Sequence, residues 1–293
     1  MQTKPYGNAG FDVSVLGLGA GQIGDSAQSE AQVAQLLNTA LDIGVTLIDT
    51  ARGYGLSEER IGHHLAHRRS EFVLSTKIGY GIPGHSDWTG DIIEAGVDAA
   101  LSLMRTDRID IVHLHSCELS TLQAGDVVED LLRMRTKGKL RIAAYSGENE
   151  ALAWAVASAK FCGIECSVNL FDQASLGGPL VQARERGLGV IAKRPLGNAP
   201  WRFAERPVGN YCETYWQRMQ TLACDRAGLP WDELALRFAA WQPEVSCAIA
   251  GTASIEHLRH NVAIVEKGPL PADLVAALQR RFVSVGRDWG GEV

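Results

Sequence analysis

Short apolar runs rich in β-branched residues alternate along this chain with longer segments whose apolar residues recur at helical spacing. The runs that predict strands are Ser14–Leu18, Val45–Asp49, Phe72–Lys77, Ile109–His115, Leu140–Ser146, Ile164–Leu170, Leu188–Ala192 and Val245–Ala250. Strict alternation of strand and helix is typical of a parallel sheet covered by helices.

The segments between these runs predict the helices. Those with the clearest helical spacing are Glu30–Ile43, Glu58–His67, Thr89–Met104, Leu122–Lys137, Ala151–Phe161, Trp231–Trp241 and Glu256–Val265. Ser29 and Ser57 precede two of them, where a hydroxyl can cap the first turn. Gly44 and Gly138 follow helical segments at points where the chain must turn. Eight such units in 293 residues favour a closed (β/α)₈ TIM barrel over an open sheet.

Three segments fall outside the eight-fold pattern. Lys4–Tyr6 and Phe11–Val15, joined by Gly7–Gly10, predict an N-terminal β-hairpin that could plug one end of the barrel. Pro271–Val285 predicts an extra C-terminal helix, and Gly197–Tyr215 is long enough to lie over the barrel mouth. No change in composition divides the chain, so residues 1–293 are expected to form a single domain.

Charge and composition exclude several classes of protein. The 34 acidic residues outnumber the 28 basic ones, for a net charge of -6, which argues against a nucleic-acid or anionic-membrane surface. No apolar run approaches the roughly 18 residues that a membrane span requires, and the first ten residues lack the apolar core of a signal peptide. The six cysteines form no CxxC pair, which favours reduced thiols and a cytoplasmic protein. A monomer or small homo-oligomer is expected.

Gly19–Gly24 spells G-x-G-x-x-G after an apolar strand, the pattern of a dinucleotide-binding Rossmann turn. In a Rossmann unit the last glycine opens a helix, whereas here Asp25–Ser29 is typical of a loop that ends in a helix cap. A tight glycine turn at the mouth of a barrel is therefore the favoured interpretation.

Chemically active side chains follow the ends of three consecutive predicted strands. Asp49 ends the second strand and Tyr54 lies in the loop after it, Lys77 ends the third strand, and His115 ends the fourth. Active sites of such barrels gather at the carboxyl ends of the strands. A lysine cation beside a tyrosine favours phenolate and makes the phenol a better acid. Tyr54 could then donate a proton to a carbonyl, with Asp49 holding Lys77 and His115 orienting the substrate oxygen.

With these residues the chain resembles the aldo-keto reductases. The resemblance rests on the segments Gly44–Ala51, Tyr54–Glu58, Ser75–Lys77, Asp110–His115, Gly138–Arg141, Tyr145–Ser146, Val168–Asp172 and Ala250–Ser254, with His257, Leu258 and Asn261. It implies that Asp49, Tyr54, Lys77 and His115 form a catalytic tetrad for an NAD(P)H-linked reductase or dehydrogenase.

The resemblance also implies where the nicotinamide dinucleotide binds. Ser146 and Asn169 match the residues that hold its carboxamide, while the companion glutamine of the family is replaced by Glu165. The remaining matches are Lys193, Arg194, Pro195 and Leu196 for the pyrophosphate, and Gly251, Thr252, Ser254, His257 and Asn261 for the adenosine end. The usual cations near Gly251 and at His257 are missing, although Arg259 could substitute. NADP(H) is therefore favoured only slightly, because the family commonly uses it, and NAD(H) is possible.

The substrate site is less defined. Trp88 and Cys117 are candidates for its wall, although a plain packing role suits Trp88 equally well. His113 and His115 share a strand face, but no further ligand is expected to join them, so no metal site is predicted. The resemblance implies a small-molecule carbonyl compound or alcohol as substrate, an aldehyde, ketone or sugar. Gly55–Glu58 is similar to the sugar dehydrogenases of the family, which favours a polyol or aldose. The rival interpretation is a regulatory or sensor subunit that binds NADP(H), like the family's potassium-channel β subunits, with incidental turnover.

Overall fold

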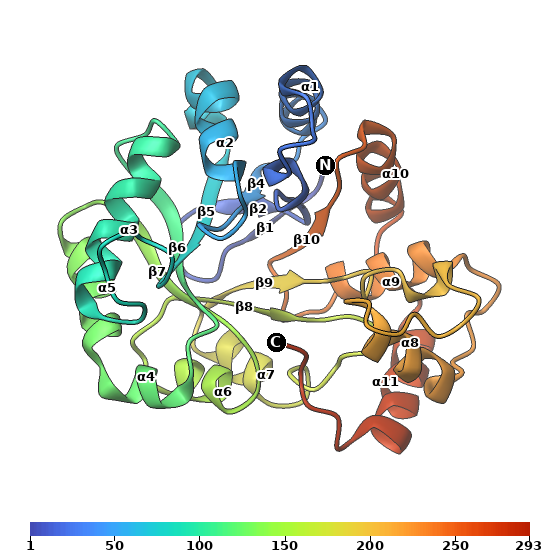
Figure 1. The fold of residues 1–293 in the computed structure, drawn as a ribbon. Coiled ribbons are helices and arrows are strands. Elements are labelled where there is room, and N and C mark those ends of the chain that lie inside the picture. Colours follow the sequence, from blue (N-terminus) through green and yellow to red (C-terminus); the bar gives the residue numbers. More distant parts are fainter.

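The computed structural model describes residues 1–293 and shows a closed barrel of eight parallel strands, as predicted (Figure 1). Around the barrel the strands are β3 (Leu16–Gly19), β4 (Leu47–Asp49), β5 (Val73–Ile78), β6 (Ile109–His115), β7 (Leu140–Ser146), β8 (Gly163–Ser167), β9 (Gly189–Lys193) and β10 (Cys247–Gly251). β10 pairs with β3 and so closes the ring.

Helices surround the barrel on the outside (Figure 1). They are α1 (Glu30–Asp42), α2 (Ser57–Leu65), α3 (Gly90–Leu103), α4 (Leu119–Ala124), α5 (Asp126–Thr136), α6 (Asn149–Ala157), α7 (Pro179–Glu185), α8 (Glu213–Leu222), α9 (Trp231–Ala240), α10 (Ile255–Glu266) and α11 (Ala272–Gly286). Short 3₁₀ turns cover Gln22–Gly24, Ala66–Glu71 and Pro200–Arg202. The predicted extra C-terminal helix is α11.

Three predictions of local structure were wrong in detail. Ser57, expected to cap its helix, is the first residue of α2, and its hydroxyl instead donates to the Ala20 carbonyl at 2.8 Å. The single helix expected over Leu122–Lys137 is two helices, α4 and α5, because Gly125 between them adopts a left-handed backbone with φ of 95°. The strand expected over Ile164–Leu170 ends at Ser167, after which Asn169 forms an antiparallel bridge with Asp172. That turn brings Asp172 back beside the strand end, where it binds the end of the chain.

The N-terminal hairpin, β1 (Thr3–Pro5) and β2 (Asp12–Ser14), is present as predicted. Tyr6 in its turn is fully buried and stacks on Phe11, with ring centroids 5.5 Å apart. The Tyr6 side chain also packs against Gly163 and Gly189. A Cβ atom at Gly163 would lie 2.4 Å from its hydroxyl oxygen and one at Gly189 would lie 2.3 Å from its ring, so both strands need glycine there. The hairpin therefore closes the N-terminal end of the barrel.

The opposite end of the barrel is open. Figure 1 shows the C-terminus over this end, beside β8 and β9. The main hydrophobic core lies between the outer faces of the strands and the helices that cover them. No helix of the protein is both long and apolar enough to cross a membrane.

Candidate active site

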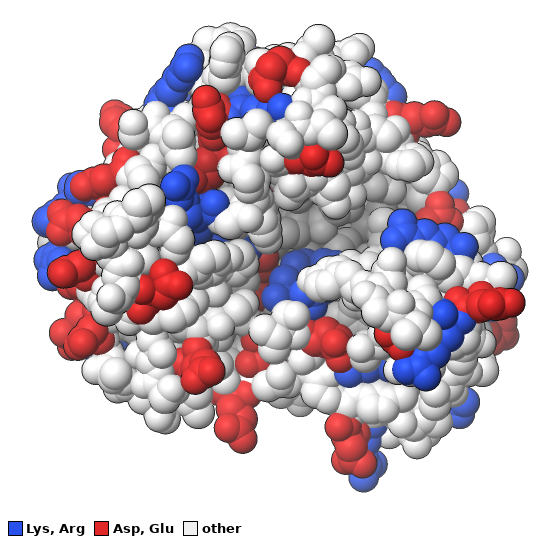
Figure 2. Space-filling model, in the orientation of Figure 1, with Lys and Arg blue, Asp and Glu red and all other residues white.

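A cavity of about 910 Å³ opens at the carboxyl ends of the barrel strands. Figure 2 shows it as a hollow near the middle of the face, with Lys and Arg atoms along one edge. Asp49, Tyr54 and His115 line the cavity, and Lys77 lies directly behind them. The four residues singled out from the strand ends are thus brought together at one mouth.

Lys77 is the centre of a buried ionic cluster. Its Nζ donates a hydrogen bond to the Asp49 carboxylate and one to the Thr50 carbonyl at 3.1 Å, and it lies 3.2 Å from Oε1 of Glu165. Each of the three charged side chains is no more than 2% exposed. Burial lowers the pKa of Lys77, but the two carboxylates outweigh it and hold the pKa well above its usual range. Lys77 is therefore a permanent cation.

Tyr54 is positioned by the glycine turn that follows β3. A Cβ atom at Gly24 would lie only 1.7 Å from the Tyr54 carbonyl, and the Gly24 carbonyl accepts a hydrogen bond from Leu56 N at 3.0 Å. Any side chain at Gly24 would push the Tyr54 loop away from the barrel. The glycines of the G-x-G-x-x-G motif therefore form a tight turn at the mouth, as favoured from the sequence, and shape the site that holds Tyr54.

The acidity of Tyr54 was predicted with the wrong sign. Lys77, whose Nζ is 5.4 Å from the Tyr54 ring centre, lowers the pKa of the phenol. Burial and the negative charges of Asp49 and Glu165 outweigh this effect and raise the pKa to about 12. Tyr54 is therefore protonated in the resting site, and Lys77 is the neighbour that makes proton release easier.

His115 is held by a residue that the sequence analysis missed. Its Nδ1 is 2.9 Å from the Tyr80 hydroxyl, and the two rings stack with centroids 5.4 Å apart. Burial, with the charges of Lys77 and Lys193, lowers the pKa of His115 to about 3, so the ring is neutral. When Nδ1 accepts from Tyr80, the ring proton is on Nε2, which has no protein partner and can donate to a substrate oxygen.

His113 lies behind the site, and the expectation that no ligand would join it was wrong. Ligand atoms of Asp49, His113 and Glu165 lie within 4.8 Å of one another, close enough to hold a metal ion. The ammonium group of Lys77 already lies against both carboxylates. Burial lowers the pKa of His113 to about 3, so this histidine adds no charge. The positive charge in the cluster therefore comes from Lys77.

Beside this cluster, three buried polar atoms have no protein partner: Ser146 Oγ, Glu165 Oε2 and Asn169 Nδ2. Ser146 and Glu165 are paired in register on β7 and β8, and both line the cavity. A buried polar group without a partner is costly, so these atoms indicate a polar ligand. Glu165 can accept from the amino group of a carboxamide, and Ser146 lies beside it on the cavity wall. Asn169, also predicted to hold the carboxamide, is fully buried and does not line the cavity.

The other predicted cofactor residues follow the cavity from β9 to α10. Lys193, Arg194, Pro195, Leu196, Gly251, Thr252, His257 and Asn261 all line it. Ser254 lies outside the lining and caps the start of α10, where its Oγ accepts from His257 N at 3.3 Å. Arg259, offered as a substitute cation, does not line the cavity, which instead has Asp232, paired with His260 at 2.7 Å.

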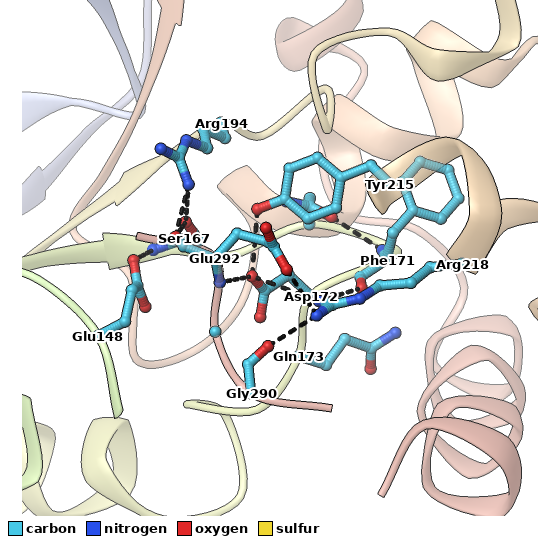
Figure 3. A network of polar contacts seen from close by, with 12 residues as sticks. Glu148, Ser167, Phe171, Asp172, Gln173, Arg194, Tyr215, Arg218, Gly290 and Glu292 are labelled. Carbon is cyan, nitrogen blue, oxygen red and sulfur yellow. Dashed lines mark hydrogen bonds and ion pairs between the residues drawn. The ribbon is translucent and has the colours of Figure 1, made fainter. Parts of the chain in front are cut away.

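The chain after α11 forms part of the cavity wall, and Figure 3 shows how it is fastened. Arg218 donates to the Gly290 carbonyl and to Oε1 of Glu292, both at 2.9 Å, and Glu292 N donates to Asp172 at 3.0 Å. Arg194 donates to the Glu292 carbonyl at 2.5 Å and to the Tyr211 hydroxyl. The Arg194 guanidinium therefore binds this tail as well as facing the cavity.

Neither candidate for the substrate wall lines the cavity. Trp88 packs against Tyr80, with ring centroids 5.8 Å apart, and Cys117 is buried with its carbonyl accepting from Tyr145. Tyr80, Gln22, Trp201 and Tyr211 line the cavity instead and were not singled out from the sequence. The sequence contained one signal for Tyr80, which is an aromatic residue three positions after Lys77, just beyond the end of the predicted strand.

Known proteins match this chain over most of its length. The sequence profile described as the Aldo/keto reductase family matches residues 15–281. This chain belongs to the aldo/keto reductase family. It is therefore an NAD(P)H-dependent oxidoreductase with the barrel fold of that family.

Individual aldo/keto reductase relatives are distant but cover nearly the full chain. L-galactose dehydrogenase of Arabidopsis thaliana is 24% identical, over 90% of this chain and 88% of its own. D-threo-aldose 1-dehydrogenase of a Pseudomonas species is 26% identical, over 92% and 94%. A protein described as a probable voltage-gated potassium channel subunit beta, from Arabidopsis thaliana, is also 26% identical, over 94% of each chain.

Among solved structures, the holo form of an aldo-keto reductase from Bacillus halodurans superimposes with a TM-score of 0.84 and covers 96% of both chains. Its sequence is 23% identical, so this likeness concerns the fold.

Proposed function

We propose that this aldo/keto reductase interconverts a hydroxyl and a carbonyl group of an aldose or related polyol, with Tyr54 as the general acid and base. The observation that carries the proposal is the placement of Tyr54 and His115 on the cavity wall, directly in front of the Lys77 ammonium group. A proton donor, an oxygen-orienting donor and a fixed cation are what carbonyl reduction requires.

The side chains divide the reaction between them. A bound nicotinamide ring would supply the hydride that adds to the carbonyl carbon. Tyr54 donates its phenolic proton to the carbonyl oxygen, and the neutral His115 ring donates a hydrogen bond to the same oxygen. Lys77 stabilises the phenolate that Tyr54 becomes, while Asp49 and Glu165 keep the ammonium group in place. In the oxidation direction, Tyr54 takes up the hydroxyl proton and the same contacts operate in reverse.

The proposed substrate class rests on the two sugar dehydrogenases among the relatives and on the polar rim of the cavity, to which Asn198 and Asn210 contribute. The test is steady-state turnover of aldoses, polyols and simple aldehydes with oxidised or reduced cofactor. We expect many turnovers per site with at least one aldose. Less than one turnover per site across the panel would contradict the proposal and favour a regulatory subunit, the role in which one relative is described.

The proposed cofactor preference is weak. The adenosine end of the cavity has His257 and His260 but also the acidic Asp232, whereas a 2′-phosphate prefers several charge-assisted bonds. We expect NADPH and NADH to bind within about a hundredfold of each other, roughly 2.7 kcal/mol. His257→Arg should strengthen NADPH binding about tenfold more than NADH binding, as one added charged hydrogen bond contributes roughly 1.5–3 kcal/mol.

Fluorescence titration of both cofactors at one ionic strength measures this preference. Arg259→Gln is the matched control, because Arg259 lies outside the cavity and its loss should leave both affinities unchanged. An equal gain for both cofactors in His257→Arg would place the 2′-phosphate elsewhere.

A further inference from the structure

The cavity floor holds one more negative charge than positive charge. Asp49 and Glu165 both carry carboxyl groups, and a single ammonium group, that of Lys77, lies between them. Burial and the charge of Glu165 raise the pKa of Asp49 to about 6, so Asp49 is ionised at neutral pH. His113, His115 and Tyr54 surround the cluster as neutral groups, because burial displaces the pKa of each toward its uncharged form. Lys193, the next cation along the wall, lies 3.2 Å from a carboxylate oxygen of Glu148. The surplus charge therefore has no buried counter-ion.

This surplus charge lies at the cavity wall. One carboxylate oxygen of Glu165 lies 3.2 Å from Lys77 Nζ, whereas the other has no hydrogen-bond partner and lies 3.7 Å from Nε2 of the neutral His113. Glu165 lines the cavity beside the unpartnered hydroxyl of Ser146, its register partner on the neighbouring strand. A buried, unpaired acceptor that carries negative charge is stabilised by a ligand that brings a hydrogen-bond donor and positive charge together.

The oxidised and reduced forms of a nicotinamide differ in the charge that they bring to Glu165. Both carry a carboxamide, whose amino group can donate to Glu165, but the ring is a cation when oxidised and neutral when reduced. The amide side chain of a glutamine would satisfy the same hydrogen bond without distinguishing the two rings. Glu165 distinguishes them through its charge, in a site with little water to screen it.

We propose that Glu165 makes this site select the oxidised, positively charged nicotinamide over the reduced one, and so fits the protein to work as a dehydrogenase. The proposal rests on the proposed function, since it requires that the carboxamide end of the cofactor bind at Ser146 and Glu165. It concerns relative affinity, which equilibrium binding measures without any turnover.

The experiment is a titration of the oxidised and reduced dinucleotide against four proteins: wild type, Glu165→Gln, Glu165→Asp and Glu58→Gln. The wild type should bind the oxidised form at least as tightly as the reduced form. In Glu165→Gln the ratio of the two dissociation constants should shift at least tenfold against the oxidised form, about 1.4 kcal/mol. Glu165→Asp retains the charge and should retain most of the selectivity.

Glu58→Gln is the matched control. Glu58 is also a buried carboxylate with one oxygen that has no hydrogen-bond partner, although Arg52 lies 3.6 Å from it, and Glu58 does not line the cavity. Its substitution should leave the ratio unchanged.

The outcomes separate the two proposals. If the wild type binds neither form, the proposed function fails. If both forms bind and Glu165→Gln leaves their ratio unchanged, the selectivity by Glu165 is overturned while the proposed function stands. Should Glu165→Gln not fold, the wild type decides, because a reduced form bound more tightly than the oxidised form contradicts the proposal.

Discussion

The two ends of the barrel interior are built from the same strands yet have opposite chemistry. At the N-terminal end, Leu47, Val73 and Ile111 point inward and pack with Tyr6 into a buried apolar cluster. Two to four residues further along those strands, Asp49, Lys77 and His113 also point inward and form the polar cluster beneath the cavity. Residues separated by an even number share a face of a strand, so one strand supplies both layers.

This difference separates stability from function. The apolar end gains free energy by removing carbon surface from water and excludes solvent through the hairpin. The polar end buries three charges, which is favourable only because the ammonium group and the carboxylates meet directly. Substitutions at the apolar end should therefore change stability with little effect on turnover, whereas those at the polar end should abolish turnover.

The largest combined loss of activity and stability is expected for Lys77→Met, which removes the only cation of the polar cluster. Losing one preorganised electrostatic group costs about 10²–10³ in kcat, and leaving two carboxylates unpaired should cost about 3–5 kcal/mol of stability. The two effects are measured by steady-state kinetics and by urea unfolding.

Lys4→Met is the control at the other end of the barrel, where Lys4 donates to the carbonyls of Ala240 and Val245 at 2.9 Å and 3.0 Å. Lys4→Met should lower the free energy of unfolding but leave kcat unchanged. A loss of activity as large as that of Lys77→Met would contradict the assignment of stability and turnover to opposite ends of the barrel.

The second prediction concerns the N-terminal hairpin that closes the apolar end of the barrel. Tyr6→Ala should lower the free energy of unfolding by about 3–5 kcal/mol, as expected for a large aromatic side chain removed from a core. Cofactor affinity should be unchanged, since Tyr6 lies at the closed end. Tyr6→Phe should be neutral or stabilising, because the Tyr6 hydroxyl is buried without a partner. A clear destabilisation by Tyr6→Phe would show that this hydroxyl forms a hydrogen bond in solution.

A smaller effect is expected for Tyr80→Phe, which keeps the ring on His115 but removes the hydroxyl from Nδ1. We expect kcat to fall about tenfold, close to the roughly 1.5 kcal/mol of one neutral hydrogen bond, with cofactor affinity unchanged. Imidazole nitrogen chemical shifts should show that His115 no longer has its proton mainly on Nε2. Trp88→Phe changes the ring next to Tyr80 and should leave both readouts as in the wild type. An unchanged tautomer in Tyr80→Phe would contradict the role given to Tyr80.

Much of this arrangement follows from the sequence. Strict strand–helix alternation predicts the barrel, and residues at strand ends predict which side chains meet at its mouth. The contact between Glu165 and Lys77 could not be predicted from pairing, because β8 and β5 are not neighbours in the sheet and meet only across the narrow interior. The pKa of Tyr54 also depends on burial, which adjacency to Lys77 alone does not reveal. Helices α7 and α8 were missed; α7 has only seven residues, but α8 has ten, more than the nine of the predicted α2 and α6, so its length does not explain the miss.

The measurement that tests the central claim most directly compares Tyr54→Phe with the wild type in single-turnover reduction and in cofactor titration. The variant loses only the phenolic proton donor and keeps the ring beside Lys77. We predict that the chemical step slows by about 10²–10⁴-fold while the dissociation constant of the cofactor stays within about threefold, the pattern of an interaction made only in the transition state. A chemical step as fast as that of the wild type would contradict the assignment of Tyr54 as the proton donor.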